Sequence, residues 1–441
     1  MNPSTVEKVG KAGVVGAGGA GFPTHIKISC RAEVVLANGM ECEPLLRVDR
    51  QMMERHAPEV INGMKAVMEH CGARKGVICL KRKYHQAVKE LSMALADSSG
   101  IELFLSDSFY PAGDEQQLVY AVTGRVVPAG GIPPDVGAVV LNVSTLVNIS
   151  NALDGIPVTS KTVTVAGEVG TPVTLAVPIG TPVRKLVEAA RGPEESAGYS
   201  LVIGGPLMGQ VTADWDTPVT KTTSGVIVLP ADHRLIIRKT KPLENDYRLI
   251  KSACCQCNYC TQMCPRNALG LRLEPHKVMR AVGYGDAGAL GDANAVFACC
   301  DCGICTFYAC PMELSPGRMV TAIKNEMARK GIKPVKRVPR QVSGEIGYKR
   351  VPLHRLADRV GISKYDVEAP LREAPLEVGE VRIPLKQHIG VPAVPVVKAG
   401  DSVKAGDPIG EMPEGKMGAN VHASISGTVI AVDGDSVRII R

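Results

Sequence analysis

The placement of the cysteines constrains this chain more than any other feature. Ten of its 14 cysteines fall in two short windows, 254–264 and 299–310. The windows form an internal repeat, because ACCQCNYC at 253–260 returns 45 residues later as ACCDCGIC at 298–305. A secreted disulfide scaffold spreads its cysteines over a small chain, whereas two dense windows in a long chain indicate metal ligation in a reducing compartment.

Each window has the spacing C-x2-C-x2-C followed by a Cys-Pro pair, with one extra residue before the last cysteine of the second window. This is the ligand run of bacterial two-cluster ferredoxins, in which three thiolates wrap one [4Fe-4S] cluster and the fourth ligates the other cluster. We therefore expect two crossed ligand sets. One set is Cys254, Cys257, Cys260 and Cys310, and the other is Cys299, Cys302, Cys305 and Cys264.

Other interpretations of the cysteines remain open at this point. Structural zinc also uses C-x2-C pairs and is the alternative for both windows. Cys255 and Cys300 are not needed as ligands, and we expect them to pack beside the clusters. The four cysteines outside the windows, Cys30, Cys42, Cys71 and Cys79, are expected to be buried thiols.

Composition excludes several classes of protein. A length of 441 residues predicts about three domains, and 45% hydrophobic with 22% charged residues is ordinary for a globular protein. No apolar run reaches the ~20 residues of a membrane span, and the N-terminal residues make a poor signal peptide. A net charge of +7 and only 4% aromatic residues do not favour nucleic acid as a partner. We expect a cytoplasmic protein without a transmembrane segment.

Patterning predicts a multidomain chain. Residues 1–157 alternate apolar strands with helical patterns, such as 51–70 and 84–96, and predict an α/β domain with a mainly parallel sheet. Residues 158–232 predict a small β-rich unit with one helix at 182–191. Residues 240–330 hold the cysteine windows, with one helix and a turn expected over 266–297 and a helix over 316–330. A basic connector, 331–375, and an all-β module, 376–441, complete the chain.

A glycine-rich loop, GAGGAGFP at 16–23, lies near the start of the α/β domain. Glycines let backbone N–H groups approach a phosphate closely because no Cβ intervenes. The sequence of the loop alone does not separate a phosphate site from a simple tight turn.

Other segments of the same domain make the assignment of this loop more specific. GAGGAGFPTHIK at 16–27, NGMECEP at 38–44, YPAGDEQQL at 110–118 and NVSTL at 142–146 together resemble the flavin- and NADH-binding subunit of respiratory complex I. They resemble the C subunit of the Rnf electron-transport complex still more closely. The order of modules is most similar to the cobalamin reductases of propanediol-utilization microcompartments. In the Rnf proteins, a barrel-sandwich hybrid module precedes the flavin domain, whereas here the similar module comes last.

The resemblance implies FMN, NAD(H) and two [4Fe-4S] clusters as cofactors, a soluble-ligand-binding β-grasp (SLBB) fold for 158–232, a ferredoxin-like di-cluster segment and a barrel-sandwich tail. It implies that the glycine loop cradles the FMN phosphate, that Lys27 adds a charge there, and that Phe22 packs against a nucleotide ring. Further positions implied at the flavin or nicotinamide are Asn38, Glu41, Glu43, Gly113, Glu115, Asn142 and Thr145. The glycines in question are Gly16, Gly18, Gly19 and Gly21.

The sequence also departs from its relatives. Ala17 stands where complex I has an arginine, Met40 replaces an acidic residue, and the aromatic residues that clamp adenine in complex I are not evident. The stretch 420–427 of the tail lacks the modified lysine of biotinyl and lipoyl carriers, so we predict no such group and a docking or scaffolding role for the tail.

The resemblance implies that electrons pass from NADH to FMN, then through the clusters to cobalamin, with no catalytic acid or base required. The implied partners are a corrinoid or a corrinoid-carrying adenosyltransferase and a microcompartment shell protein, which would place the chain inside a bacterial microcompartment. Two alternatives stay open: a peripheral Rnf-type subunit of a membrane complex, and an iron–sulfur relay or scaffold without a working flavin site.

Overall fold

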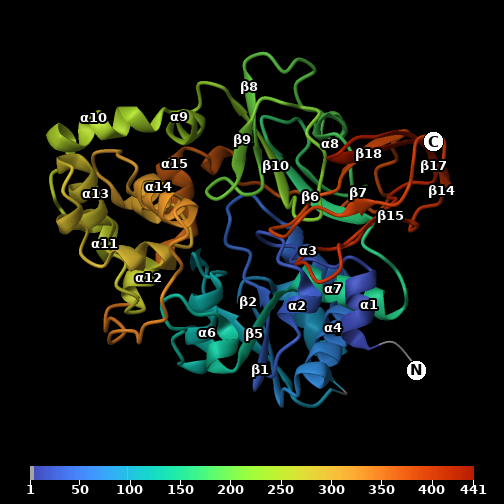
Figure 1. The fold of residues 1–441 in the computed structure, drawn as a ribbon, viewed down its shortest axis with the longest axis horizontal. Coiled ribbons are helices and arrows are strands. Elements are labelled where there is room, and N and C mark those ends of the chain that lie inside the picture. Colours follow the sequence, from blue (N-terminus) through green and yellow to red (C-terminus); the bar gives the residue numbers. More distant parts are fainter. Residues whose placement is uncertain (1–3, 97) are drawn as a thin grey trace.

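The computed structural model describes residues 4–96 and 98–441 (Figure 1). Five parts are visible in it, which we name the N-terminal module (4–157), the middle module (158–232), the cysteine module (240–330), the connector (331–375) and the tail module (376–441). The helices of the cysteine module gather on one side of the molecule, and the tail module lies on the opposite side, above the first helices of the chain (Figure 1).

A four-stranded parallel sheet is the centre of the N-terminal module, which confirms the predicted parallel sheet. Its order is β3 (Ile101–Ser106), β2 (Lys75–Lys81), β1 (Val34–Gly39) and β5 (Ala138–Asn142). Successive side chains of β1 enter different cores: Val35 packs with the cluster that holds most helices, and Leu36 packs with a second cluster on the other face. Both faces are therefore buried, as expected for a parallel sheet.

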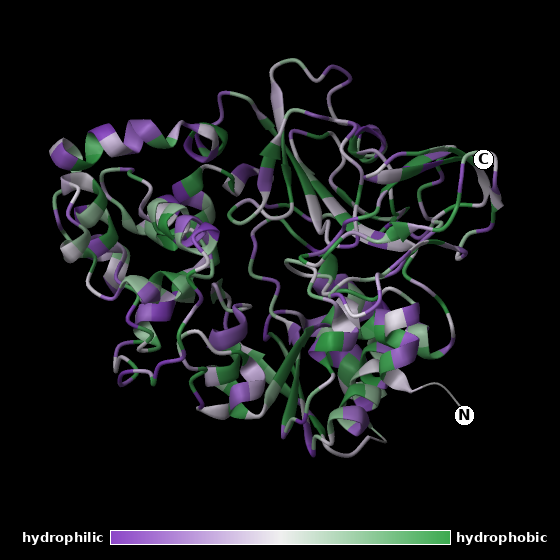
Figure 2. Cartoon of the chain, viewed as in Figure 1, coloured by the Kyte–Doolittle hydropathy of each residue, from purple (hydrophilic) through white to green (hydrophobic). Residues whose placement is uncertain are grey.

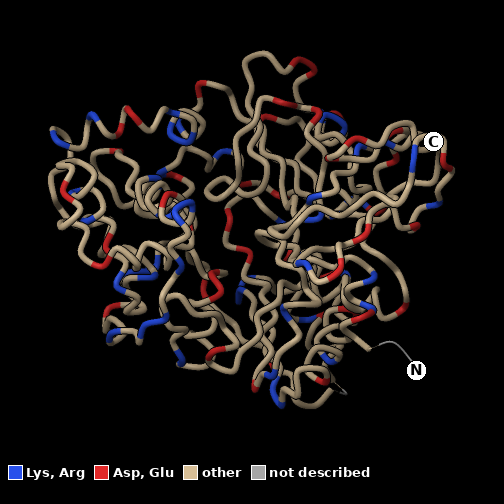
Figure 3. The backbone as a smooth tube through the Cα atoms, viewed as in Figure 1, with Lys and Arg blue, Asp and Glu red and all other residues tan. Residues whose placement is uncertain are grey.

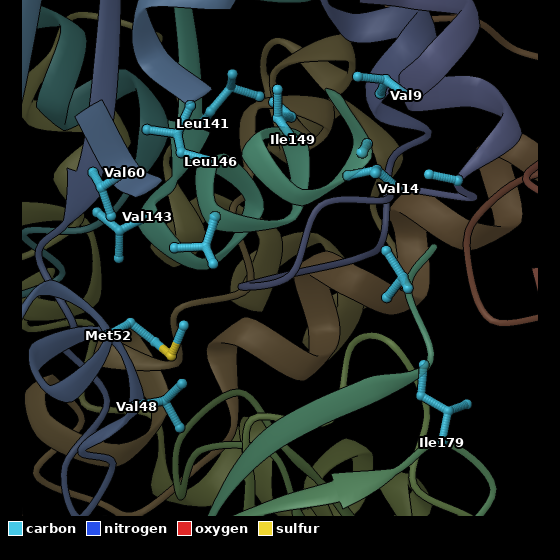
Figure 4. Packing of buried hydrophobic residues seen from close by; sticks show 14 of the residues in the cluster. Val9, Val14, Val48, Met52, Val60, Leu141, Val143, Leu146, Ile149 and Ile179 are labelled. Atoms are coloured by element: carbon cyan, nitrogen blue, oxygen red, sulfur yellow. The ribbon is translucent and has the colours of Figure 1, made fainter. Parts of the chain in front are cut away.

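Helices cover both faces of this sheet. One face carries α1 (Thr5–Lys11), α3 (Val48–Arg55), α4 (Ala57–Cys71), α5 (His85–Ala94) and α7 (Val143–Leu153), and the other carries α6 (Glu115–Thr123). The helix expected over 51–70 is interrupted at His56, because Pro58 begins a new helix in α4. Helices α4 and α7 touch at Gly63, where a Cβ would lie 2.1 Å from the carbonyl oxygen of Leu146. Val60, Leu141 and Leu146 pack at this contact (Figure 4).

The remaining short elements of the N-terminal module are α2 (Thr24–Lys27), β4 (Phe109–Tyr110) and the 3-10 turn η1 (Pro133–Val136).

The middle module has a five-stranded sheet in the order β7-β6-β10-β8-β9, in which only β10 and β6 are parallel. Helix α8 packs on it, as predicted for a β-rich unit with one helix. The elements are β6 (Ser160–Gly167), β7 (Val173–Pro178), α8 (Val183–Ala189), β8 (Tyr199–Ile203), β9 (Gln210–Thr212) and β10 (Gly225–Pro230).

The cysteine module is helical, and α9 (Arg234–Thr240) leads into it from the middle module. It holds α10 (Leu243–Ala253), α11 (Tyr259–Gln262), α12 (Pro265–Ala268), α13 (Pro275–Tyr284), the 3-10 turns η2 (Ala287–Leu290) and η3 (Ala293–Ala298), the π-helical turn η4 (Cys305–Ala309) and α14 (Pro316–Arg329). The helix expected over 316–330 is confirmed. The expectation of one helix and a turn over 266–297 is too simple, because helical turns flank α13 on both sides.

The prediction of a plain basic connector is wrong in its second half. Here β11 (Val351–Pro352) pairs with β4, and α15 (Leu353–Val360) is followed by the turn η5 (Ser363–Tyr365). Leu356 and Val360 of α15 join a core cluster with Tyr110 and Phe307. The sequence interpretation missed this two-turn amphipathic helix because charged side chains separate its apolar positions.

The tail module is all-β, as predicted. One sheet has the order β12-β18-β17-β14 and the other β13-β15-β16. The module is fastened to the start of the chain by the buried Lys221 of the middle module, whose Nζ donates to the carbonyl oxygens of Gly13 (2.7 Å) and Asn420 (2.6 Å). The strands are β12 (Glu380–Pro384), β13 (Val394–Pro395), β14 (Ser402–Val403), β15 (Pro408–Glu411), β16 (Val421–His422), β17 (Gly427–Val432) and β18 (Ser436–Ile440).

Charged residues of both signs are spread along the whole described chain. Lysine and arginine alternate with aspartate and glutamate over all parts of the chain (Figure 3), and the apolar residues gather in the sheets and on inward helix faces (Figure 2). Within residues 4–96 and 98–441, no helix is long and apolar enough to cross a membrane.

Candidate functional site

The glycine loop lies at the N-terminus of α7. A bridge between Val15 and Pro23 closes the loop, and the N–H of Gly16 donates to the carbonyl oxygen of Phe22 at 3.0 Å. The N–H of Ala17 donates to Oγ1 of Thr145, in the first turn of α7, at 2.9 Å. These two bonds hold the loop at the positive end of an 11-residue helix, a place that favours an anion.

The tip of this loop has room for a ligand. A Cβ on Gly19 would meet no atom within 4 Å, whereas one on Gly18 would lie 2.7 Å from Nδ2 of Asn142. Gly21 has a φ of +73° and lies against Thr222 of the middle module. The open side of this cradle at Gly19 is backbone without side chains, a surface that suits a phosphate group. Phe22 is half-buried beside it.

Beneath the loop lies a network of buried charges that joins the predicted Glu41 to two residues that the sequence interpretation missed, Asp49 and Lys161. Nζ of Lys161, on β6, donates to the carbonyl oxygen of Ala17 at 2.8 Å. The carboxylate of Asp49 accepts from Nδ2 of Asn142 at 2.9 Å, and Oε1 of Glu41 accepts from the N–H of Asp49 at 3.0 Å. Burial lowers the pKa of Lys161 to about 8, and burial with the nearby Asp49 raises the pKa of Glu41 to about 7.

The sequence signal for these residues was weak. Lys161 stands near the start of a strand that continues with β-branched residues, and Asp49 lies in the first turn of a helix without any motif around it. Their roles depend on contacts between modules, which no local pattern records.

A second group of predicted residues meets beside α6. Nζ of Lys27 lies 3.3 Å from both carboxylate oxygens of Glu115, so its charge is directed to that carboxylate. Nδ2 of Asn38 donates to the carbonyl oxygen of Gly113 at 2.9 Å. Asn38 and Asn142 lie at the carboxyl ends of neighbouring parallel strands, the edge at which ligands bind in open α/β sheets.

Glu43 has different surroundings. Its carboxylate accepts from the N–H groups of Leu207 (2.8 Å) and Met208 (3.1 Å), and the hydroxyl of Tyr110 lies 3.1 Å from its Oε1. Burial raises the pKa of Glu43. Glu43 is therefore engaged with the middle module, apart from the glycine loop.

The thiols fall into two groups. The inner set, Cys264, Cys299, Cys302 and Cys305, lines a cavity of about 400 Å³, and Cys300 lies in the same wall. The outer set, Cys254, Cys257, Cys260 and Cys310, lines a smaller cavity of about 30 Å³ together with Cys255. The last cysteine of each window thus lies with the first three of the other, which is the predicted crossing.

All eight donors are thiols, the ligand type of iron–sulfur clusters. Within the part of the chain that the structure describes, no three cysteine, histidine or acidic side chains converge as they would around a single metal ion.

The two cysteine loops have the same backbone conformation at equivalent positions. Gln256 and Asp301 have φ values of 57° and 55°, and Asn258 and Gly303 have 65° and 74°. Asparagine and glycine are the residues that adopt this left-handed conformation most readily. The extra residue of the second window is accommodated in the π-helical turn η4, where the first window has the α-helical turn α11.

Comparison with family descriptions assigns each module. Residues 9–151 match the Nuo51 FMN-binding domain, and 162–211 match the SLBB domain. Residues 253–315 match a 4Fe-4S dicluster domain, and 363–438 match the RnfC barrel sandwich hybrid domain. The chain therefore has an FMN-binding domain and a 4Fe-4S domain.

Whole-chain comparisons extend this result. The chain is 40% identical over 438 residues to proteins named cobalamin reductase PduS from Citrobacter freundii and from Salmonella typhimurium, covering 99% of this chain and 96% of each relative. It is 33% identical over 272 residues to the C subunit of the Na(+)-translocating ferredoxin:NAD(+) oxidoreductase complex of Acetobacterium woodii, covering 60% of this chain and 58% of that relative.

Solved structures of NAD+-reducing [NiFe]-hydrogenase also align with the chain at 22% identity. The H2-reduced form covers 75% of this chain and 62% of its own with a TM-score of 0.46, and the air-oxidized form covers 80% and 66% with a TM-score of 0.49.

Proposed function

This chain belongs to the family of PduS cobalamin reductases, and from that membership we propose that it is an NADH-dependent flavin and iron–sulfur reductase whose acceptor is a corrinoid. The observation that carries the proposal is the match over 99% of the chain to the named cobalamin reductases, which includes both the glycine loop and the thiol sets. When bound, FMN accepts a two-electron hydride and the clusters carry single electrons, so one NADH supplies the two one-electron reductions from cob(III)alamin to cob(I)alamin.

The residues that would hold FMN follow from the site. The open glycine loop and the N-terminus of α7 would bind the phosphate, and Thr145 would hold the loop in place through Ala17. Asn38 and Asn142 at the sheet edge would face the isoalloxazine ring. Lys161 would orient the peptide of Ala17, because a bonded carbonyl oxygen fixes the direction in which the following N–H points.

We propose two [4Fe-4S] clusters, one on each thiol set. The grouping of Cys310 with the first window and of Cys264 with the second supports the count, since one cluster would leave four grouped thiols without a metal to bind. Glu115, held by Lys27 next to the flavin side, is the acidic residue we propose for the nicotinamide region.

By family resemblance alone, we extend the proposal to the setting of the enzyme. The corrinoid would be presented by an adenosyltransferase or bound directly, and the enzyme would work in a bacterial microcompartment, in contact with a shell protein. An Rnf-type function is the second candidate, but the chain spans 96% of the cobalamin reductases and only 58% of the Rnf-type relative.

Anaerobic purification followed by cofactor analysis tests the proposal. We expect bound FMN, about eight iron atoms per chain by the two-cluster count, and NADH oxidation that depends on cobalamin more than on ferredoxin. Absence of flavin and of NADH oxidation would leave an iron–sulfur relay instead. A preference for ferredoxin would favour the Rnf-type function.

A Gly19→Ala variant tests the cradle itself. A methyl group at Gly19 meets no protein atom within 4 Å, so the folded protein should keep its stability while FMN affinity falls at least tenfold. Gly434→Ala is the matched control, because Gly434 also has open space around a Cβ but lies in the tail module. Equal FMN affinity in both variants would contradict the proposed phosphate site.

A further inference from the structure

We propose that the two thiol sets work in a fixed order: the inner set receives electrons from the flavin site, and the outer set passes them to the acceptor. The proposal rests on the proposed function and adds direction to it. Tyr110 and Arg266 are the positioning residues that hold the inner set against the N-terminal module.

The polar contacts between the N-terminal module and the cysteine module all reach one thiol set. Among the described residues there are three. The hydroxyl of Tyr110 donates to the carbonyl oxygen of Cys302 at 2.8 Å, and Nε2 of Gln117 donates to that of Pro265 at 2.7 Å. Nη2 of Arg266 donates to Oδ2 of Asp114 at 2.6 Å. Cys302, Pro265 and Arg266 all line the inner cavity.

The ion pair between Asp114 and Arg266 is well placed for this role. The two side chains are only 6% and 10% exposed, so the pair is a buried joint between modules. Asp114 caps α6 by accepting from the N–H of Gln117 at 3.0 Å. The next residue is Glu115, which binds Lys27 on the flavin side. One helix terminus therefore contacts both the residues proposed for the flavin region and the wall of the inner set.

Tyr110 makes a second buried contact between the modules. Its buried hydroxyl lies between the carbonyl oxygen of Cys302 and Glu43, which in turn binds the N–H of Leu207. Leu207 of the middle module and Lys239 of α9 complete the wall of the inner cavity. The inner set is thus enclosed with help from the two modules that also enclose the glycine loop.

Among the described residues, no side chain of the N-terminal or middle module donates to the outer set, although Nη2 of Arg359, in the connector, lies 3.5 Å from the carbonyl oxygen of Cys310. The cavity of the outer set is lined entirely by residues of the cysteine module, from Cys254 to Pro316. Cys255 in the same loop is exposed, and Tyr259 and Met312 beside it are 52% and 46% exposed. The outer set therefore faces solvent, where an acceptor can approach.

The crossing of the ligand sets brings the inner set, next to the flavin site, close to the outer set, next to solvent. Cys264 and Cys310 each lie with the window they do not belong to, so both loops contribute to both sites. Helix α11, which carries Cys260 of the outer set, packs against the turn η4, which begins at Cys305 of the inner set. An electron that reaches the inner site has the outer site as its neighbour.

Serine variants of one cysteine from each set test the order. Anaerobic Cys302→Ser and Cys257→Ser proteins are first analysed for iron and, after dithionite reduction, by electron paramagnetic resonance, which identifies the cluster that remains. NADH is then added in place of dithionite. We expect NADH to reduce the inner cluster that remains in Cys257→Ser and to leave the outer cluster of Cys302→Ser oxidised.

Reduction of the outer cluster by NADH in Cys302→Ser would overturn the order while leaving the proposed function intact. If NADH reduces neither cluster in the unaltered protein, both the proposed function and the order are wrong.

A Tyr110→Phe variant keeps the test decisive if either serine variant fails to fold. It retains every thiol and loses only the hydroxyl, so iron content, bound FMN and the dithionite-reduced spectrum should be unchanged. We expect rapid freeze-quench spectra to show NADH reducing the inner cluster about tenfold more slowly. Tyr308→Phe, within the same cysteine loop, is the matched control. An unchanged rate in Tyr110→Phe, or an outer signal that rises before the inner one, would contradict the proposal.

Discussion

The two cysteine loops are nearly the same in sequence and backbone but differ in what surrounds them. The cavity beside the loop from Cys254 to Cys260 is lined by residues of the cysteine module, and Cys255 in this loop is exposed. The loop from Cys299 to Cys305 is covered by the N-terminal and middle modules, and its continuation is held by the guanidinium of Arg238, which lies 5.3 Å over the ring of Phe307. The difference shows that the repeat specifies ligand geometry, whereas the other modules decide which site is covered.

The largest effect is expected from breaking the buried joint of the covered loop. Arg266→Met leaves the carboxylate of Asp114 buried without its partner, which should cost about 3–5 kcal/mol of unfolding free energy. Arg329→Met is the control, since its pair with Glu326 is exposed to solvent and should contribute little to stability. Anaerobic denaturant titration measures both. Similar losses in the two variants would show that the inner loop is no better anchored than the surface.

Exchanging the left-handed residues of the two loops should give the next effect. A Cβ at Gly303 would lie 2.7 Å from the ring of Phe307, so Gly303→Asn should destabilise the protein by about 1–3 kcal/mol. The reverse change in the open loop, Asn258→Gly, keeps an allowed conformation and should alter stability by less than about 1 kcal/mol. The same titration compares them. Equal losses of unfolding free energy in the two variants would contradict the close contact between Gly303 and the ring of Phe307.

The stability of the folded protein should also depend on pH through Glu43, which lies near the covered loop. Burial raises its pKa in the folded state above the ordinary value of about 4.3, so the folded state holds the proton more tightly than the unfolded state. Stability from this group is present at low pH and is lost as pH rises from about 4.3 towards the raised value. Glu43→Gln should flatten that part of the profile of melting temperature against pH. A profile that keeps its slope would assign the slope to other carboxylates.

Lys161 extends the comparison to the glycine loop, which the middle module also covers. Lys161→Met removes a charged hydrogen bond to Ala17, and such bonds contribute about 1.5–3 kcal/mol, so FMN should bind at least tenfold more weakly. Lys185→Met, at an exposed lysine of the same module, is the control. Flavin release under dilution measures the change, and equal release would remove Lys161 from the site.

The smallest effect is expected at the unused cysteine of the open loop. Cys255 is exposed and has a thiol that neither predicted set needs, so Cys255→Ser should leave iron content and stability unchanged within about 0.5 kcal/mol. Cys300→Ser, in the covered loop beside Arg266, should be the more disturbing of the two. The reverse ranking would contradict the assignment of covered and open loops.

Local patterns predicted those parts of the molecule that local chemistry decides. The spacing of the cysteines limits which thiols can meet, and the structure groups Cys264 and Cys310 as the crossing requires. Asn38 and Asn142, which the family resemblance had implied at the flavin, lie at one edge of the parallel sheet. The parallel sheet itself followed from apolar strands alternating with helices.

Contacts between modules could not be predicted in this way. Lys161 bonds to Ala17 across 144 positions and Arg266 to Asp114 across 152, and no motif marks either pair in the sequence. Helix α15 was missed because charged residues flank its few apolar positions, and its core partners Tyr110 and Phe307 are distant in the chain. These residues join modules, so their pattern exists only after folding.

The hydrogen bonds of Lys221 bear on how the order of the modules can differ between related chains. The amine of Lys221 binds Gly13 and Asn420 at once, and Nδ2 of Asn420 also donates to the carbonyl oxygen of Lys11 at 3.4 Å. The last module therefore lies against the first helix. Rearranging a gene so that this module is encoded before the first helix, as in the Rnf order, would change one covalent connection and leave these contacts in place. Such a circular permutation needs only a suitable linker, so relatives with opposite module orders are able to share one assembled architecture.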